Sequence, residues 1–229
     1  MNLTIKPANP VRTTLTPSSF YGIRCPRCLW LQYWHGIQYK PNLNLQLHLA
    51  DLQERSYDGV DSSLISGEIP TGKVSRYKEK FNSTSIKING EETRWSIRGE
   101  IDLLVDHQDG TFSIIDGKVS QIDSSEKLIS SYQNQLEAYA FSFENPLNGD
   151  VKPIRSIGLL QRYIDDAIMT SSNARAFSVL HRYVPVTRDE PRFMNFLEKF
   201  IGIIEGDFPE SGTYCDTCDF LKKVGFQYE

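Results

Sequence analysis

The chain has 229 residues, 39% of them hydrophobic and 24% charged, which fits one folded domain and excludes a disordered or fibrous chain. No apolar run is long enough to cross a bilayer, and the N-terminal residues lack the apolar stretch of a secretory signal, so we expect a cytoplasmic protein without a membrane segment. The net charge of −4 weakens the case for nucleic-acid binding by bulk charge, although it leaves room for a local basic groove.

Helices are predicted in the first quarter of the chain. One is expected from Thr16 to about Trp34, because threonine followed by proline is typical of a helix start, with a break at Pro26, which cannot donate a backbone hydrogen bond. A second helix is expected over residues 45–57. The Gly-, Ser- and Pro-rich segment 58–83 is expected to form a mobile loop.

The middle of the chain is predicted to be rich in strands. Residues 85–89 and 93–106 read as two strands joined by a hairpin turn at Asn89-Gly90. Asp109-Gly110 indicates a second hairpin turn, and residues 111–119 form a short apolar strand. This meander supplies the centre of an expected sheet.

A helix, two strands and a long helix complete the prediction. The first helix is expected to begin at Asp123, with Glu126 three residues later as in a capping box. Strands are expected over 154–163 and 176–184, and the last helix over 187–206. This order favours an α/β core with a mixed sheet over a doubly wound parallel sheet.

Four cysteines form two C-x-x-C pairs near opposite ends of the chain: Cys25, Cys28, Cys215 and Cys218. Two structural disulfides are not expected in a reducing compartment. Four thiolates in two close pairs form a closed tetrahedral set, which suits zinc or an iron–sulfur cluster. The alternative is one redox-active pair and two incidental cysteines, but no basic group is evident that would activate one thiol over its partner. We therefore predict a four-ligand metal site.

Two carboxylates and a lysine fall on neighbouring strands of the expected sheet. Asp116 and Lys118 are two residues apart, so their side chains point to the same face, and Asp102 lies on the adjacent hairpin strand. Paired carboxylates bind a hard divalent cation such as magnesium, which polarises a phosphoryl oxygen and lowers the pKa of a bound water. The lysine would orient that water or neutralise charge that develops on the phosphoryl group.

This pattern has a structural alternative. An Asp-x-Lys triplet is expected about once by chance in a chain of this length, and Asp150-Val151-Lys152 is such a match in a predicted turn. The apolar residues around Asp116 and Lys118 favour function, because charges in a buried strand need a partner. Gln135 and Tyr139 share a face of the next helix, where they either assist this site or belong to a core stripe with one solvated glutamine.

Together these motifs resemble the PD-(D/E)XK nuclease superfamily in its RecB-like branch. Gly99-x-x-Asp102, Asp116-x-Lys118 and Gln135-x-x-x-Tyr139 occur in the order of that branch. The segment 18–31, which contains the first cysteine pair, is similar to the start of the CRISPR-associated RecB-like exonucleases. The resemblance spans roughly residues 16–218 and implies a restriction-endonuclease-like α/β core, with a central mixed β-sheet flanked by helices.

The resemblance implies a metal-dependent nuclease that hydrolyses DNA phosphodiester bonds, as an exonuclease or an enzyme that processes ends or single strands. Asp102 and Asp116 would be ligands of Mg²⁺ or Mn²⁺, and Lys118 would be the catalytic lysine. Gln135 and Tyr139 would position the substrate or the lysine.

A histidine on an early helix is a further metal ligand in many RecB-like nucleases. His48 is the candidate here, and Asp51, one turn further along the same predicted helix, is its alternative. An apolar stretch surrounds His48, so a structural role is the competing interpretation.

In the CRISPR-associated relatives, cysteines near both chain ends hold a [4Fe-4S] cluster. The resemblance therefore implies one domain over 1–229 in which the segments 16–36 and 207–220 form a cysteine staple around such a cluster, with Zn²⁺ as the alternative. The chain departs from these relatives in three ways. Its cysteines are split two and two, Val224 stands where a further cysteine is expected, and Gly117 replaces the usual tyrosine, with its side expected to face away from the site.

A nuclease of this charge needs a local track for phosphates and bases. The basic candidates are Arg24, Arg27, Lys73, Arg76, Lys78, Lys80, Arg94 and Arg98. The aromatic candidates for base stacking, for which core packing is the alternative, are Phe20, Tyr21, Trp30, Tyr77 and Trp95. The expected partners are DNA that is single-stranded or has free ends and a protein of a CRISPR-adaptation or DNA-repair complex.

Two further hypotheses compete with the nuclease. One is a non-catalytic nucleic-acid- or protein-binding module on the same fold with a structural zinc site. The other is an unrelated α/β domain with a zinc staple, in which the carboxylates form a solvated strand face. The intact set of Asp102, Asp116 and Lys118 favours the nuclease, because a non-catalytic relative has no need of it.

Overall fold

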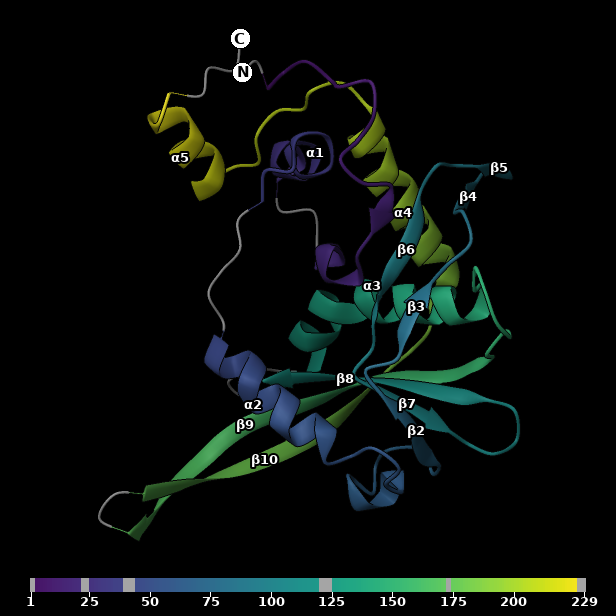
Figure 1. The fold of residues 1–229 in the computed structure, drawn as a ribbon, viewed down its shortest axis with the longest axis vertical. Coiled ribbons are helices and arrows are strands. Elements are labelled where there is room, and N and C mark those ends of the chain that lie inside the picture. The colour runs from purple at the N-terminus through teal and green to yellow at the C-terminus, as the bar shows by residue number, and fades with distance from the viewer. Residues whose placement is uncertain (1–2, 22–24, 39–43, 120–124, 172–173, 226–229) are drawn as a thin grey trace.

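A five-stranded mixed sheet lies at the centre of the structure, with helices on both of its faces (Figure 1). The computed structural model describes residues 3–21, 25–38, 44–119, 125–171 and 174–225. The expected mixed α/β class is confirmed. No helix in these ranges is both long and apolar enough to cross a membrane.

The elements follow one another along the chain as strands, helices and two short 3-10 helices. The helices are η1 Pro17–Phe20, α1 Pro26–His35, α2 Asn44–Arg55, η2 Ser62–Leu64, α3 Ser125–Glu144, α4 Glu190–Glu205 and α5 Asp216–Lys223. The strands are β1 Thr14–Leu15, β2 Lys73–Tyr77, β3 Lys80–Asn82, β4 Lys87–Ile88, β5 Glu91–Glu92, β6 Ser96–Glu100, β7 Leu103–Asp106, β8 Phe112–Val119, β9 Ile154–Ser171 and β10 Ala174–Val186.

The main sheet has the order β10-β9-β8-β7-β2, and only the β8–β9 pair is parallel. This pair needs a crossover, which α3 supplies. A smaller sheet has the order β1-β6-β3, and β4 pairs with β5 across the predicted Asn89-Gly90 turn. Both turn residues have positive φ, as a tight two-residue hairpin requires.

The two faces of β8 contact different helices, because side chains alternate along a strand. Asp116 and Lys118 point toward α3, where they contact its polar and aromatic residues. Gly117 points the other way, toward the α2 residue Glu54. The helices α2 and α3 therefore cover opposite faces of β8, as the ribbon also shows (Figure 1).

Most of the apolar core lies on the α3 side of the sheet. There α4 packs against α3, and α1 packs against α4. Phe20 of η1 is fully buried there among the rings of Phe193, Phe196 and Phe200, at centroid distances of 5.0–6.2 Å. A smaller cluster lies on the other face and includes Ile65. Burial on both faces explains why the β8 sequence is mostly apolar before Asp116.

Several boundaries differ from those predicted. The first helix begins at Pro26 rather than breaking there, because proline is well tolerated in the first turn of a helix. The segment 58–83 contains η2, β2 and β3 rather than a loop alone, so that prediction was wrong. The single strand predicted over 93–106 is divided into β6 and β7, and β5 precedes it. The predicted start at Asp123 lies outside the described residues.

The hairpin of β9 and β10 is longer than predicted. β8 pairs with β9 only as far as Arg162, so within the described residues the rest of β9 pairs with β10 alone. In Figure 1 this part forms an arm that projects from the sheet.

Candidate functional site

The predicted acidic residues meet at the C-terminal part of β8. Asp102 lies in the bend between β6 and β7, and its Oδ2 accepts a hydrogen bond of 2.7 Å from the backbone N–H of Gly117. Gly117 stands between Asp116 and Lys118. This one bond therefore fixes the carboxylate of Asp102 beside the strand that carries the other two groups.

Asp116 is 2% exposed, and its carboxylate is held on both oxygens. Its Oδ1 accepts hydrogen bonds from the hydroxyl of Tyr139 at 3.2 Å and from Nε2 of Gln135 at 3.3 Å. Its Oδ2 is 2.5 Å from Nζ of Lys118. Gln135 and Tyr139 thus contact the carboxylate rather than the lysine, and α3 determines the orientation of Asp116.

Lys118 remains positively charged in this environment. Its side chain is 18% exposed, and burial disfavours the charged form, but the charges of Asp116 and Asp102 outweigh this effect and raise the pKa of the ammonium group. Its Nζ also lies 4.5 Å from the ring centroid of Tyr132 on α3. The group can therefore orient an anion or stabilise its charge, but it is not poised as a general base.

Neighbouring carboxylates act on Asp102. Burial and the charges of Asp116 and Glu54 raise the pKa of Asp102 to about 8. The carboxylate oxygens of Asp102 and Asp116 are the kind of donor that a hard divalent cation prefers. Within the described ranges, the cysteines are the only group of three or more potential metal ligands whose donor atoms lie close together.

A buried ion pair that the sequence did not reveal lies behind the site. Nη2 of Arg162, on β9, is 2.5 Å from Oε1 of Glu54, on α2, and these residues are 1% and 4% exposed. A Cβ atom at Gly117 would lie 1.7 Å from that Nη2. The glycine in the Asp-Gly-Lys triplet therefore makes room for the ion pair. Its Cβ position lies on the opposite face of the strand from Asp116, as predicted.

Replacing Gly117 with alanine should destabilise the fold by about 3 kcal/mol, because the added methyl group has to displace a buried, paired guanidinium. Chemical denaturation measures this change. Gly202→Ala is the matched control, since nothing surrounds its Cβ position on α4, and it should stabilise the protein by about 0.5–1 kcal/mol. Equal effects of the two substitutions would contradict the close packing of Arg162 over the strand.

Replacing Asp102 with asparagine should stabilise the metal-free protein at pH 8 and much less at pH 5. The native pKa of about 8 lies above the unfolded value of about 3.9. Folding therefore favours the protonated acid, and this stability is complete below about pH 4 and is lost as the pH rises toward 8. Thermal unfolding in a chelator at both pH values measures the effect.

Asp150→Asn serves as the control for that series, because Asp150 is an exposed aspartate in the chance Asp-x-Lys triplet. Its Tm should follow the wild-type Tm at both pH values. The difference in Tm between the wild type and Asp102→Asn should therefore depend on pH. An equal difference at pH 8 and pH 5 would contradict the electrostatic description of the site.

The structure does not bring His48 to this site. Its side chain is exposed on α2, whereas Glu54, further along the same helix, is buried and influences the pKa of Asp102. Asp51 forms ion pairs with Lys78 and Arg55. Helix periodicity alone could not distinguish these acidic residues, because it does not reveal which face of α2 packs on the sheet.

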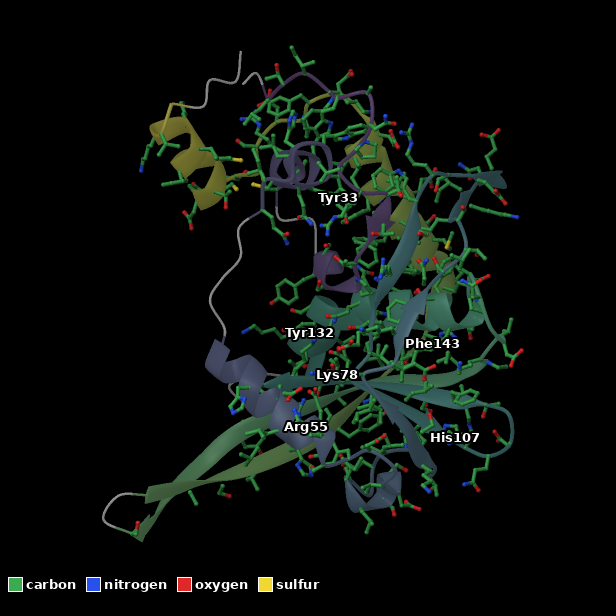
Figure 2. All side chains as sticks on the ribbon, in the orientation of Figure 1. Tyr33, Arg55, Lys78, His107, Tyr132 and Phe143 are labelled. Carbon is green, nitrogen blue, oxygen red and sulfur yellow. The ribbon has the colours of Figure 1, made fainter. Side chains whose placement is uncertain are left out.

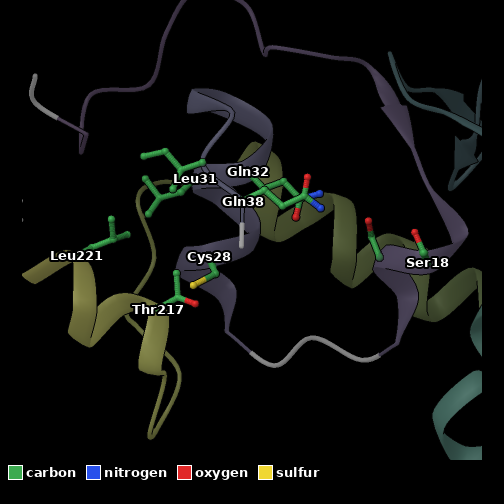
Figure 3. Close-up of a pocket in the computed structure, with 9 residues that line it drawn as sticks. Ser18, Cys28, Leu31, Gln32, Gln38, Thr217 and Leu221 are labelled. Atoms are coloured by element: carbon green, nitrogen blue, oxygen red, sulfur yellow. The ribbon is translucent and has the colours of Figure 1, made fainter. Parts of the chain in front are cut away.

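The four cysteines converge, as predicted from their spacing. Their sulfur atoms lie within 4.8 Å of one another, with separations of 3.4 Å for Cys28–Cys215, 3.5 Å for Cys28–Cys218 and 3.6 Å for Cys25–Cys218. Figure 3 shows Cys28 of α1 facing Thr217 of α5. Two elements from opposite ends of the chain thus form one thiol cluster.

The thiols require a cation if they are to ionise together. Burial and the neighbouring thiols raise the pKa of Cys28, and burial raises the pKa of Cys218 to about 12. Burial also acts on Cys25, but the backbone N–H of Gly212, 3.1 Å from its sulfur, contributes to a lowered pKa there. Four thiols this close together could hold a metal ion, which would displace their protons.

Burial excludes three of the five aromatic residues predicted to stack on bases. Phe20, Trp30 and Trp95 are fully buried, whereas Tyr21 is 37% exposed. The remaining basic candidates are exposed or take part in ion pairs, namely Lys73, Lys80 and Arg98, together with Arg27, Lys78 and Arg94. Arg24 and the side chains of Arg76 and Tyr77 lie outside the described residues.

Comparison with known proteins gives a family. A model described as the PD-(D/E)XK nuclease superfamily matches residues 45–222. A solved structure described as "Crystal structure of SSO0001" is similar to this chain, with 15% sequence identity and a TM-score of 0.47. The similar region covers 90% of this chain and 81% of that one. No curated protein matches the sequence. The family match contains Asp102, Asp116 and Lys118.

Proposed function

The chain belongs to the PD-(D/E)XK nuclease superfamily, and on this basis we propose that it is a metal-dependent deoxyribonuclease that acts on single strands or free ends. One observation carries the proposal. Asp116 lies between a lysine ammonium on one oxygen and two hydrogen-bond donors of α3 on the other, next to a second carboxylate from the bend between β6 and β7. A solvated strand face has no need of such an arrangement.

Asp102 and Asp116 would hold Mg²⁺ or Mn²⁺. Their fit is supported by the raised pKa of Asp102, which results from burial and from unbalanced negative charge, and by the oxygen donors that both residues offer. The bound cation would polarise a phosphoryl oxygen and lower the pKa of water. We retain His48 only as a predicted ligand without geometric support.

The chain's own residues have separable tasks in this proposal. Lys118 presents a fixed positive charge to the phosphoryl group and to the hydroxide or water that attacks it. Gln135 and Tyr139 hold Oδ1 of Asp116, so that the carboxylate keeps one orientation. The Gly117 N–H does the same for Asp102. They are positioning residues that act through the two carboxylates.

We assign the cysteine cluster to a single Zn²⁺ ion in preference to the [4Fe-4S] cluster that the resemblance implied. A tetrahedral ion with Zn–S bonds of about 2.3 Å separates its sulfurs by about 3.8 Å. Three of the sulfur separations are 3.4–3.6 Å, close to this value, and all lie within 4.8 Å. A cubane cluster attaches each cysteine to a different iron, which keeps the sulfurs further apart.

We further propose that the chain belongs to the RecB-like branch and acts in CRISPR adaptation or DNA repair with a protein partner. In this proposal residues 1–229 form one domain, which is stapled through 16–36 and 207–220. The cysteine pairs at both ends of the chain support the branch and the staple. The pathway and the partner rest on resemblance alone.

Cleavage of end-labelled single-stranded, double-stranded and forked DNA tests the proposed function. Wild-type protein should cut with Mg²⁺ or Mn²⁺ and not in a chelator, and Asp116→Asn should be inactive, whereas Asp150→Asn should retain activity. Mg²⁺ should also raise the Tm of the wild type but not of Asp102→Asn, a result that does not depend on finding the right substrate. Failure of both tests would favour the non-catalytic binding module.

A further inference from the structure

Lys78 has a backbone conformation that lysine rarely adopts. Its φ is +54°, in the left-handed region, where the Cβ of most residues lies too close to the following carbonyl. The residue lies between β2, which pairs with β7, and β3, which pairs with β6, so the chain passes there from the main sheet to the smaller one. A glycine would make this passage without strain. The lysine side chain therefore needs a separate explanation.

This strained residue lies directly beside Asp102. The backbone N–H of Lys78 donates a hydrogen bond of 3.3 Å to the backbone carbonyl of Asp102. The carboxylate of Asp102 in turn accepts the N–H of Gly117, the residue before Lys118. Lys118 lies on the α3 face of the sheet, whereas the ammonium of Lys78 reaches α2, on the other face. Two lysines thus approach the bend at Asp102 from opposite faces.

The ammonium of Lys78 forms an ion pair with Asp51 of α2, which also accepts a hydrogen bond of 2.6 Å from Nη2 of Arg55. Figure 2 shows Lys78 and Arg55 beside α2. The side chains of Lys78 and Asp51 are 36% and 24% exposed, and ion pairs that reach solvent contribute little to stability. The ion pair alone therefore does not explain a strained lysine at this position.

The charge of Lys78 also reaches the acidic site. Burial raises the pKa of Glu54, and the charges of Arg162 and Lys78 oppose that effect. Glu54 in turn contributes to the raised pKa of Asp102. The ammonium of Lys78 is therefore close enough to act on the carboxylates and exposed enough to meet an anion from solvent.

We propose that Lys78 binds a phosphate of the DNA backbone next to the one that is cut, and that this phosphate replaces Asp51 as the anion paired with the ammonium. The inference rests on the proposed nuclease and adds a substrate-binding residue to it. DNA that lies across the bend at Asp102 would meet Lys118 at the phosphate that is cut and Lys78 at its neighbour. The exchange of one anion for another keeps the lysine paired with and without substrate.

The salt dependence of DNA binding tests this proposal without cleavage. In a chelator, each phosphate contact with a single-stranded oligonucleotide contributes about 0.7 to the slope of log K against log salt concentration. Lys78→Gly should therefore reduce the slope by about 0.7 and weaken binding about fivefold at about 0.1 M salt. Lys78→Arg, which keeps the charge, should keep the slope. Asp51→Asn removes the competing carboxylate and should strengthen binding.

Thermal unfolding separates this role from a structural one. Lys78→Gly relieves the strain, so its Tm should rise by about 1–3 °C although binding weakens. Gln108→Gly is the matched control, because Gln108 is exposed and has a φ of +61°, and it should raise the Tm without changing DNA binding. Lys87→Ala, on the β4–β5 hairpin, controls for the loss of a lysine and should leave the slope unchanged.

The outcomes distinguish the role of Lys78 from the proposed function. If the wild type binds and cuts DNA but Lys78→Gly has the same affinity and slope, Lys78 does not touch the substrate and the nuclease stands. A folded Lys78→Gly protein that binds more weakly with an unchanged slope, or an Asp51→Asn protein that binds no more tightly than the wild type, also contradicts the exchange. If the wild type neither binds nor cuts DNA, both proposals are wrong.

Discussion

Lys118→Ala should reduce DNA cleavage by about 100- to 1000-fold while the protein stays folded. Removal of one preorganised group that stabilises transition-state charge has effects of this size. Lys118 is placed to act directly. Its ammonium touches Oδ2 of Asp116, and its pKa is raised by the two carboxylates despite burial. The charge therefore persists throughout the pH range of an assay, and a neutral residue supplies no substitute.

The loss should appear in kcat more than in KM, since the phosphoryl charge that Lys118 meets is greatest in the transition state. Lys152→Ala is the matched control, as it removes the lysine of the other Asp-x-Lys triplet, and it should leave the rate within about twofold. Single-turnover cleavage with saturating metal compares the three proteins. A folded Lys118→Ala protein that cuts like the wild type would place the active site elsewhere.

Removal of Cys218 should have the largest effect on stability. Its sulfur lies 3.5–3.6 Å from those of Cys28 and Cys25, and it is the thiol of the cluster that lies within α5, whereas Cys215 precedes the helix as its N-cap residue. Structural zinc contributes about 10–16 kcal/mol of binding free energy, much of which is lost when a ligand is removed. We expect Cys218→Ser to lower the Tm by about 10 °C or more and to leave the chain with less than one metal ion.

Elemental analysis of the purified protein checks the metal at the same time. One zinc per chain in a colourless wild type supports the mononuclear site, whereas four irons per chain in a brown protein would restore the [4Fe-4S] cluster. Thr217→Ala changes a neighbour of Cys218 on α5 and should keep both the metal and the Tm. A metal-free Cys218→Ser protein with wild-type stability would mean that the cluster does not staple the chain ends.

The sequence predicted the elements whose signals are local. The turn at Asn89-Gly90, the strand β8 and the helix that carries Gln135 and Tyr139 all follow from turn chemistry and periodicity, and the structure confirms them. The spacing of the cysteines also predicted one four-cysteine cluster, and their sulfur atoms lie within 4.8 Å of one another. These features depend on residues that are neighbours along the chain or on one element.

The remaining features depend on packing between distant segments. β2 and β3 are short and lie in a segment of loop-like composition, so their pairing with β7 and β6 left no local signal. The contact of Glu54 with Arg162 joins residues 108 positions apart. Only the glycine in the middle of the Asp-Gly-Lys triplet hinted at it, by the absence of a side chain.

The cysteine cluster also sets an order of events during protein synthesis. Cys28 and Cys215 are 187 positions apart, and the whole sheet is encoded between them. At about 5–20 residues per second, the ribosome adds that stretch in roughly 10–40 s. During this interval the thiols of the first pair exist without those of the second pair. They can be oxidised or can bind another metal. A metal bound by all four cysteines would lock the fold only after the sheet has been made, so its incorporation would follow synthesis of the core.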